Sequence, residues 1–454
     1  MSTPRRLLAR ALFLVAAWSS LSAQPAPSSF TMALTGDSII TRRLSVHAEP
    51  AFTKMIELIR GADAAFTNLE MLFHDYEPYA MNESGGTYMR AEPALAKELA
   101  WAGFDLVARA NNHTGDYGVL GMDLTTKYTA EAGLVQAGVG HSLAEAREAK
   151  FLETARGRVA LISVASTFPD HSRAGRTRGD MPARPGLNPL RFTTTYVVSK
   201  ERFEQLRQAL ADVNGRPAPA GDTLNFLGRR FEVGETPGIR TEPLEEDVRE
   251  IAAVVKSASG LADYTIVTIH AHEGDRDRFV PAQFLVTFAR AMVDAGADIF
   301  VGHGPHVLRG IEMYKGVPIL YSLGDFIFQN ETLLRLPSEN YEPYRLGPTA
   351  HVNDFNDARY NFDKTGFPSD PPIWEAVIAM PRWTDGRLAE LALHPITLGH
   401  GQPRAVRGRP MLADGPLAEK ILGDLTKLSA PFGTKIVVRD GVGYVDLPAA
   451  SSQR

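Results

Sequence analysis

Cysteine is absent from this chain of 454 residues. Disulfide bonds, thiolate metal sites and cysteine nucleophiles are therefore excluded. An excess of positive charge is also absent, because 48 Lys and Arg stand against 53 Asp and Glu, which gives a formal charge of −5. We therefore expect no nucleic-acid partner. The content of 44% hydrophobic and 22% charged residues is typical of a folded globular protein.

Long apolar runs are scarce, and the one near the N-terminus has the pattern of a targeting segment. Arg5, Arg6 and Arg10 precede the run ALFLVAAWSSL, and the small residues Ser22 and Ala23 follow it. This order predicts a signal peptide over 1–23, followed by a short linker over 24–30. The protein is then expected to be exported to the periplasm or the extracellular space. An uncleaved N-terminal membrane anchor is the alternative.

Strand-like and helix-like segments alternate over residues 31–330. The apolar runs FTMALTGDSII, ADAAFTNLE, DLVARANNH, DYTIVTIHAHEG and ADIFVGHGPHV are typical of strands, and amphipathic helices lie between several of them. Continuous apolar strands between helices predict an α/β fold with a largely parallel sheet covered on both faces. From Trp374 the pattern changes to hairpins with turns at Asp385-Gly386 and Asp440-Gly441. A C-terminal β-rich addition is therefore expected over 374–448.

Two long segments interrupt this alternation and have no predicted secondary structure. Residues 168–192 form a loop rich in Pro and Gly, and residues 331–373 form a loop rich in Asn, Asp, Pro and Tyr. Loops of this length are often functional. We consider the first as a source of anion contacts or as a solvated surface loop, and the second as a lid or as a packed or disordered loop. The arginines concerned are Arg173, Arg176, Arg178, Arg184 and Arg191, and the aromatic residues are Tyr341, Tyr344, Tyr360 and Phe362.

Metal-type side chains follow several of the predicted strands. In open α/β sheets, ligands bind at the carboxyl ends of the strands, so side chains placed there are expected to converge. Imidazole and carboxylate without thiolate suit Mn, Fe, Zn or Ni, and a two-ion site needs a bridging carboxylate. We therefore predict a site for one or two divalent metal ions of unknown identity. Its predicted ligands are Asp37, Glu70, Asn112, His270, His303 and His306, and His113 is the predicted acid that protonates a leaving group.

Each of these residues, taken alone, also has a structural explanation. Asp37 can cap the following turn, and Asn111 and Asn112 are common turn residues. A single buried histidine such as His113 is more often a hydrogen-bonded core residue than a ligand. It is the occurrence of the whole set at strand ends that favours a metal site.

At these positions the sequence resembles the capsule-synthesis CapA family, which is associated with poly-gamma-glutamate production and whose core is similar to calcineurin-like metallophosphoesterases. The resemblance implies a sandwich of sheets flanked by helices, with a CapA-like domain over 31–330. It also implies the same six metal ligands and a catalytic role for His113, with Asp116 in place of the acid that usually follows this histidine. The matching stretches are TGDSIITRRL (35–44), ADAAFTNLE (62–70), GFDLVARANNHTGDYGVLG (103–121), TIHAHEG (268–274), DIFVGHGPHVLRGIE (298–312) and PILYSLGDFIF (318–328).

The sequence departs from the metallophosphoesterase pattern at several positions. Ile39 stands where a histidine is usual, and Glu70 stands where an aspartate is commoner. Asp325 replaces an asparagine that is frequent in the capsule family, and His272-Glu273 offers a second assignment for the fourth ligand group. These differences leave open how many ions are bound.

Three functions are consistent with these features. The first is an exported metal-dependent hydrolase of an anionic or cell-envelope substrate, either a phosphoester or polyglutamate. The second is a non-catalytic polymer-binding or assembly factor that works beside a membrane capsule synthase. The third is a small-molecule binding module that kept the fold and lost the chemistry.

Overall fold

Residues 29–447 are described by the computed structural model, and all structural statements below refer to them. The predicted signal peptide over 1–23, and the membrane anchor that is its alternative, lie outside the described residues. Within 29–447, no helix combines the length and the apolarity that crossing a membrane would require.

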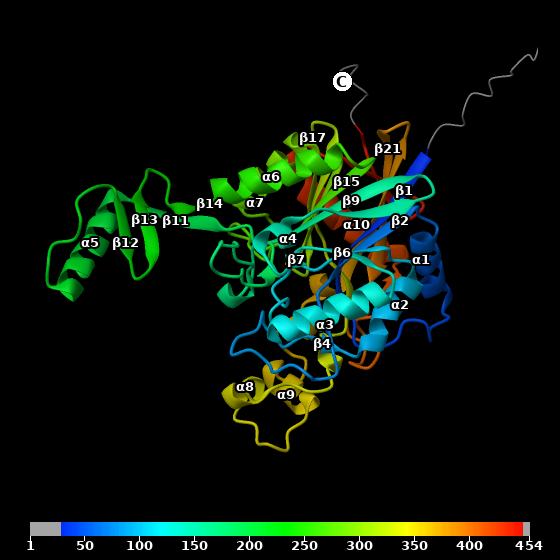
Figure 1. The fold of residues 1–454 in the computed structure, drawn as a ribbon, viewed down its shortest axis with the longest axis horizontal. Helices are drawn as coiled ribbons and strands as arrows, with labels where there is room; N and C mark the ends of the chain where they lie inside the picture. Colours follow the sequence, from blue (N-terminus) through cyan, green and yellow to red (C-terminus); the bar gives the residue numbers. More distant parts are fainter. Residues whose placement is uncertain (1–28, 448–454) are drawn as a thin grey trace, which may run out of the picture.

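A mixed ten-stranded sheet, here called the first sheet, contains both the N-terminal and the C-terminal strands (Figure 1). Its order is β23-β24-β21-β20-β1-β2-β5-β6, with β19 beside β1 and β22 beside β21. β1, β2, β5 and β6 are parallel, and β20 is antiparallel to β1, so the C-terminal β-rich segment directly extends this sheet. The strands are β1 (Ser29–Ile39), β2 (Ala64–Leu69), β5 (Leu106–Ala108), β6 (Val135–Ala137), β19 (Asp325–Phe328), β20 (Glu375–Thr384), β21 (Arg387–Thr397), β22 (Met411–Leu412), β23 (Ile436–Arg439) and β24 (Val442–Val445).

A six-stranded sheet, here called the second sheet, has the order β17-β18-β16-β15-β9-β8. Its central strands β9, β15, β16 and β18 are parallel, and β8 and β17 are antiparallel edges. The strands are β8 (Lys150–Thr154), β9 (Gly157–Ala165), β15 (Tyr264–His270), β16 (Ile299–His303), β17 (Leu308–Tyr314) and β18 (Val317–Leu323).

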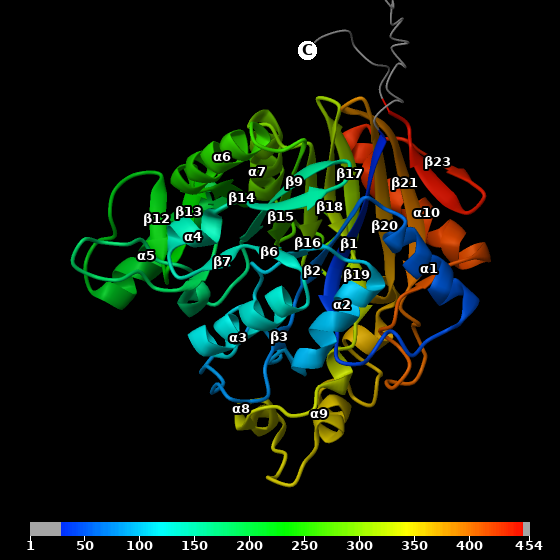
Figure 2. The same ribbon diagram turned by 45° about the vertical axis from the view of Figure 1, so that its right-hand side comes forward.

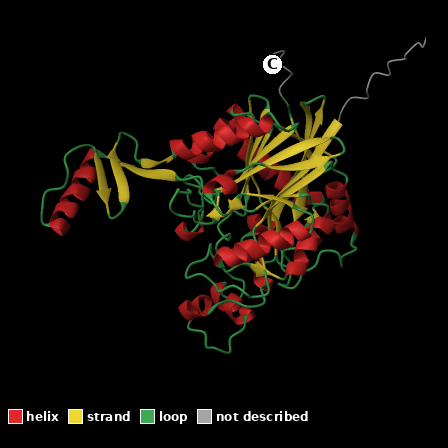
Figure 3. Ribbon diagram, viewed as in Figure 1, coloured by secondary structure: helices red, strands yellow, loops and turns green. Residues whose placement is uncertain are grey.

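The two sheets pack face to face, and helices cover their outer faces (Figures 2 and 3). Met32 and Leu34 of β1 point into the core between the sheets, whereas Ala33 points towards the helices on the outer side. The predicted α/β sandwich of sheets flanked by helices is therefore confirmed. The expected single, largely parallel sheet is replaced by two sheets, which explains why the central strands are apolar on both faces. The covering helices are α1 (Pro50–Arg60) and α2 (Ala96–Ala102) on the first sheet, α6 (Glu245–Ser259) and α7 (Gln283–Asp294) on the second, and α10 (Gly415–Ser429) against β17 and β21.

The helix α3 (Gly118–Glu131) contacts β3 (Leu72–Phe73) and β6. The remaining elements of this region are short: α4 (Leu143–Arg147), β4 (Arg90–Ala91), β7 (Val139–Gly140) and β10 (Gly186–Leu187).

Residues 192–243 form an arm that projects from the sandwich, on the left of Figure 1. Its sheet has the order β12-β13-β11-β14, and α5 packs on it. The alternation of apolar and polar residues did not predict this arm, because its strands are short and rich in Thr, Arg and Glu. Its elements are β11 (Phe192–Val198), α5 (Lys200–Asn214), β12 (Thr223–Phe226), β13 (Arg229–Val233) and β14 (Gly238–Pro243).

The segment 331–373 contains helices, so its prediction as a loop without secondary structure is wrong. It includes α8 (Ser338–Tyr341) and α9 (Val352–Arg359), together with short 3-10 turns. α9 begins with a capping box between His351 and Asp354, which satisfies backbone N–H groups at its N-terminus. This local pairing stabilises a helix that has few apolar residues.

Candidate metal centre

The carboxyl ends of parallel strands from both sheets meet at one end of the sandwich. In the first sheet, Asp37 of β1 is opposite Asn68 of β2, and Glu70 is the first residue after β2 ends. In the second sheet, His270 of β15 is opposite His303 of β16. Because the sheets pack face to face, these two edges deliver their side chains to the same buried space.

The first donor group consists of Asp37, His270 and His303, all fully buried. Asp37 Oδ1 lies 3.6 Å from His270 Nδ1 and 3.4 Å from His303 Nδ1. The amide of Asn68 donates to Asp37 Oδ1 at 2.7 Å. Thr268 Oγ1 contacts His303 Nε2 at 2.6 Å, so the other ring nitrogen of His303 faces the aspartate. Neighbouring side chains therefore fix the orientation of this group.

The second donor group consists of Glu70, His272 and His306. His306 Nε2 lies 4.0 Å from Glu70 Oε1, and His306 Nδ1 donates to Asp325 Oδ1 at 2.8 Å. A carboxylate that holds the far nitrogen of a histidine is the usual support for a metal-binding imidazole. His306 also has a φ of 56°, which is uncommon for a residue with a side chain and turns its ring towards the group.

The two groups adjoin at His270, whose ring has one nitrogen on each side. His270 Nδ1 faces Asp37, while His270 Nε2 lies 2.9 Å from His272 Nε2 and 3.8 Å from Glu70 Oε1. Asp325 also lies close enough to Asp37 and His306 to form a third set of donors. The arrangement therefore offers room for one or two cations among shared ligands.

Several oxygens at the centre are buried without a hydrogen-bond partner within the described residues. They are both carboxylate oxygens of Glu70, Oδ1 of Asn112 and Oδ2 of Asp325. Buried polar atoms in folded proteins are almost always paired, so unpaired acceptors next to imidazoles fit a cation. We conclude that the side chains present suit a divalent metal ion.

The pKa values at the centre reflect buried negative charge. Burial and the charge of Asp37 raise the pKa of Glu70 well above its usual value. Burial alone would raise the pKa of Asp37 too, but His270 and His303 outweigh it and hold that pKa well below its usual value. Burial lowers the pKa of His270 to about 4, so this ligand is neutral near pH 7. Metal binding needs a neutral imidazole and an ionised carboxylate, so His270 is ready to bind, whereas the raised pKa of Glu70 makes its metal binding depend on pH.

The pKa of His306 shifts in the opposite direction from that of His270. Burial lowers its pKa, but the charges of Asp325 and Glu70 prevail and raise it to about 10. Burial raises the pKa of Asp325 to about 6 although the charge of His306 opposes this shift. A cation at the second group would therefore compete with a proton on His306.

His113 and Asp116 form a hydrogen-bonded pair beside the second group. The loop after β5 places His113 Nδ1 2.7 Å from Asp116 Oδ2, so this nitrogen donates to the carboxylate. The backbone N–H groups of Gly85 and Met89 also donate to Asp116 and fix its position. The other nitrogen, His113 Nε2, lies 3.7 Å from Glu70 Oε1 and is free to exchange a proton at the centre.

The two asparagines before His113 have different roles. Asn111 donates to the carbonyl oxygen of Leu69 at 2.8 Å and accepts from the backbone N–H of His113, which holds the loop against β2. The Asn112 amide nitrogen donates to the carbonyl oxygen of Gly85 at 2.9 Å. Its oxygen stays unpaired, and Asn112 lines the cavity of the centre.

The structure brings together all eight predicted site residues: Asp37, Glu70, Asn112, His113, Asp116, His270, His303 and His306. Of the alternative pair, His272 joins the second group, whereas Glu273 accepts from Ser166 Oγ and Thr167 Oγ1 and takes no part. Ile39, at the position where a histidine is usual, lines the cavity, as does His272 of the second group.

Sequence reasoning missed the roles of Asn68 and Asp325. Asn68 is the residue opposite Asp37 in the neighbouring strand, a relation that needs the strand register. Asp325 lies opposite Asp37 on the other side of β1, because β19 pairs with β1. The sequence signal for Asp325 was its carboxylate at a position where the family commonly has asparagine.

A cavity of about 320 Å³ opens above the second group. His113, His272 and His306 line it, as do Arg278 and Arg359. Asp37, His270 and His303 do not line this cavity, so the second group is the one that a ligand would meet first.

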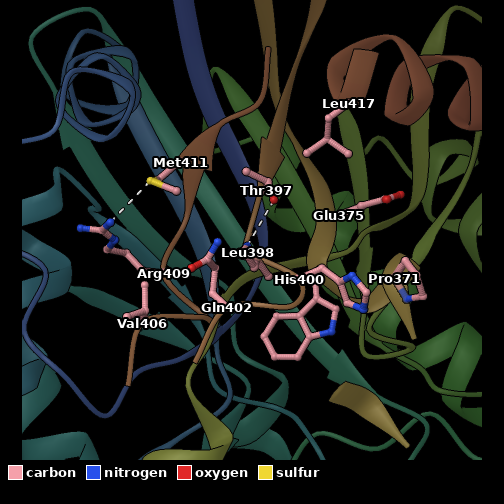
Figure 4. A pocket seen from close by; sticks show the side chains of 12 residues that line it. Pro371, Glu375, Thr397, Leu398, His400, Gln402, Val406, Arg409, Met411 and Leu417 are labelled. Carbon is pink, nitrogen blue, oxygen red and sulfur yellow. Dashed lines mark hydrogen bonds between the residues drawn. The ribbon is translucent and has the colours of Figure 1, made fainter. Parts of the chain in front are cut away.

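A larger cavity of about 590 Å³ lies beside Trp374 and contains none of these ligands (Figure 4). Its charged residues already have partners: Glu375 binds Lys420, and Arg409 binds Glu49. The volume alone therefore does not make it the chemical site.

The two long segments contribute to the site differently from expectation. The arginines of 168–192 do not line the cavity. Arg176 pairs with Glu246 and Glu250, and Arg191 pairs with Asp247, so the surface-loop interpretation fits this segment better. In 331–373, the residues that line the cavity are not the four aromatic residues singled out from the sequence but Arg359, Phe367 and Ile373.

Comparison with known proteins identifies the family. The model of the bacterial capsule synthesis protein PGA_cap matches residues 31–330. This chain belongs to that family. A Sinorhizobium fredii (strain NBRC 101917 / NGR234) relative, described as uncharacterized protein y4sH, is 40% identical over 435 residues, which cover 92% of this chain and 93% of the relative.

More distant members of the PGA_cap family have descriptive names. The PGA biosynthesis protein CapA of Bacillus subtilis is 30% identical over 59% of this chain and 58% of its own length. The capsule biosynthesis protein CapA of Bacillus anthracis is 26% identical over 66% of this chain and 59% of its own length. Among solved structures, the NAD nucleotidase NadN of Haemophilus influenzae aligns with a TM-score of 0.29 and 9% identity, over 88% of this chain and 56% of that chain.

Proposed function

We propose that this PGA_cap-family chain is a metal-dependent hydrolase that acts in capsule or polyglutamate metabolism outside the cytoplasmic membrane. The observation that carries the proposal is the His113–Asp116 pair aimed at a set of buried, partly unpaired metal-type donors. A structural metal site would not need a histidine that has one nitrogen fixed by a carboxylate and the other facing the ligands.

Each side chain of the centre has a proposed role. Asp37, Glu70, Asn112, His270, His272, His303 and His306 would hold the cation. A bound divalent cation would supply an acidified water molecule and polarise a phosphoryl or carbonyl oxygen. His113 binds the leaving group through Nε2 and gives it a proton, and Asp116 keeps the opposite nitrogen protonated and the ring oriented. The proposed substrate is anionic, either a cell-envelope phosphoester or polyglutamate.

The test separates chemistry from metal binding. We expect His113→Ala to keep the metal content of the wild type and to lower turnover by roughly 10²–10⁴-fold, the usual contribution of a general acid. Turnover would be measured on panels of phosphoesters and γ-glutamyl peptides with Mn²⁺ and Zn²⁺, and metal content by elemental analysis. As a matched control, we expect His171→Ala, which changes a histidine that contacts the carbonyl oxygen of Gly115 outside the donor groups, to leave turnover within a few-fold. Equal turnover of His113→Ala and wild type would contradict the proposal.

The names of the relatives refer to biosynthesis and not to hydrolysis, so we keep as a second candidate a non-catalytic assembly factor beside a membrane capsule synthase. In that case polymer secretion by cells would survive the His113→Ala substitution. Secretion that stops with His113→Ala, while the protein level stays normal, would instead favour catalysis.

A further inference from the structure

Two arginines line the cavity above the second group, and only one of them has an acidic partner. Arg278 forms a bidentate ion pair with Asp370, with N–O distances of 2.5 and 2.8 Å. Arg359, the last residue of α9, has no carboxylate within ion-pairing distance among residues 29–447. It is therefore a cavity-lining cation whose charge the described residues leave unpaired.

Packing fixes the Arg359 guanidinium without neutralising it. One of its nitrogens donates to Thr87 Oγ1. Its central carbon lies 5.7 Å from the ring of Phe355, 5.1 Å from that of Tyr360 and 5.9 Å from that of Phe367. Aromatic faces hold a cation in place without an opposite charge, and the remaining N–H groups stay available for a ligand.

The same contacts connect Arg359 to the metal centre. The ring of Phe367 lies 5.8 Å from the ring of His306, so one aromatic side chain separates Arg359 from a ligand of the second group. Thr87 follows Gly86, where an added Cβ would lie 3.8 Å from His113 Cε1. Arg359 is thus separated from His306 by Phe367 alone, and from His113 by Thr87 and Gly86.

We propose that Arg359 determines specificity by binding a second anionic group of the substrate, a carboxylate or a phosphate, at the end of the cavity away from the reacting bond. This inference rests on the proposed function, which assigns the reacting bond to the metal centre. The planar guanidinium matches the two oxygens of such a group, and a charge-assisted pair in a partly buried cavity is among the strongest polar contacts. Substrates with one anionic group would bind the centre only.

The experiment measures binding rather than turnover. The Zn²⁺-loaded protein is titrated calorimetrically with succinate, glutarate and adipate, each compared with the monocarboxylate of the same chain length. 3-Phosphonopropionate serves as the probe with a phosphonate at the far end. We expect at least one diacid to bind wild type about tenfold or more tightly than its monoacid, in line with a charged hydrogen-bonded pair. A stronger gain for the phosphonate would assign the far group to phosphate, and a stronger gain for the diacid would assign it to carboxylate.

Substitutions assign the effect to Arg359. We expect Arg359→Gln to remove the advantage of the diacid and to leave monoacid binding, metal content and melting temperature near wild type. Arg359→Lys should keep part of the advantage, because lysine retains the charge but not the planar fork. Lys364→Gln is the matched control, since Lys364 is an exposed cation of the same segment that does not line the cavity.

The outcomes are distinguishable from failure of the proposed hydrolase. Loss of the diacid advantage in Arg359→Gln supports the anion site even if no substrate is turned over. A diacid advantage that Arg359→Gln retains, or one that is absent in the metal-loaded wild type, overturns the inference even if hydrolysis is observed.

Discussion

The two donor groups of the centre differ in how much the protein itself satisfies them. In the first group, Asn68 and the backbone N–H of Gly304 both donate to Asp37, and the three ligand residues are fully buried. In the second group, both oxygens of Glu70 lack a hydrogen-bond partner, and His306 has a strained backbone at the edge of the cavity. The comparison leads us to expect that the first group would hold a cation firmly, whereas the second would present one to a ligand.

Asp325→Asn is expected to break this comparison most strongly, because the hydrogen bond of Asp325 goes to His306 of the second group, although its carboxylate also lies near Asp37. Asparagine keeps an oxygen that can accept from His306 Nδ1 but removes the charge that makes the ring a better ligand. Loss of such a support usually costs 10–100-fold in metal affinity. We expect the weaker of two Zn²⁺ binding steps, measured by competition with a chromogenic chelator, to fall by this factor while the tighter step stays unchanged.

Glu273→Gln is the control for this substitution, because Glu273 is a nearby carboxylate that pairs with Ser166 and Thr167 rather than with a ligand. An equal loss at both steps in Asp325→Asn would show that the two groups do not act separately.

Glu70→Gln tests, in the metal-free protein, whether the second group is the one that the protein leaves unsatisfied. The folded pKa of Glu70 lies above its usual 4.5, so its ionised form costs stability increasingly as the pH rises above that value. Glutamine has the same shape without the charge, and we expect it to raise the free energy of unfolding at pH 8 by about 1–3 kcal/mol, the usual cost of a buried unsatisfied polar group.

Urea denaturation of the chelator-treated protein measures this change. The added stability that Zn²⁺ gives the wild type should shrink in Glu70→Gln. A metal-free Glu70→Gln protein that is less stable than wild type would mean that the Glu70 carboxylate already has a partner in the fold.

The pH dependence of metal binding should also separate the two groups. His270 has a pKa of about 4, so near pH 7 a metal ion displaces no proton from it. His306 has a pKa of about 10, so near pH 7 a metal ion must displace its proton. In the metal-free protein, the raised pKa of His306 contributes stability that is present below pH 6.5 and is lost as the pH rises through about 10. Loading the second group therefore releases at least the His306 proton, and its affinity should rise at least about tenfold per pH unit between pH 6 and 8.

Calorimetry in two buffers with different ionisation enthalpies counts the released protons. At least one proton, that of His306, is expected for the weaker step, with a further contribution from Glu70, whose pKa is also raised, and none from His270 at the tighter step. Equal proton release at both steps would contradict the assignment of charge states.

The sequence predicted which candidate site residues lie together better than it predicted the periphery of the fold, and their role as a site stays a prediction. Asp37, His270 and His303 each end a continuous apolar run, and buried parallel strands bring such ends together whatever the details of the sheets. His272 remained ambiguous because His272 and Glu273 follow the same strand, and only the structure shows which of them turns inwards.

The parts that sequence reasoning missed depend on long-range pairing or on local capping. The strand register that sets Asn68 and Asp325 on either side of Asp37 joins residues far apart in the chain. The arm over 192–243 has strands such as β13 (Arg229–Val233) with no buried residue, so no apolar periodicity marks it. α9 begins at a capping box, a signal of only four residues.

The most direct test of the metal centre is the metal content of the purified protein after reconstitution with Zn²⁺ or Mn²⁺, beside a His303→Ala/His306→Ala variant that removes one imidazole from each donor group. The account predicts one to two metal equivalents per chain in the wild type and loss of both in the variant, with far-UV circular dichroism unchanged. A wild type that binds no metal, or a variant that keeps the full content, would contradict it.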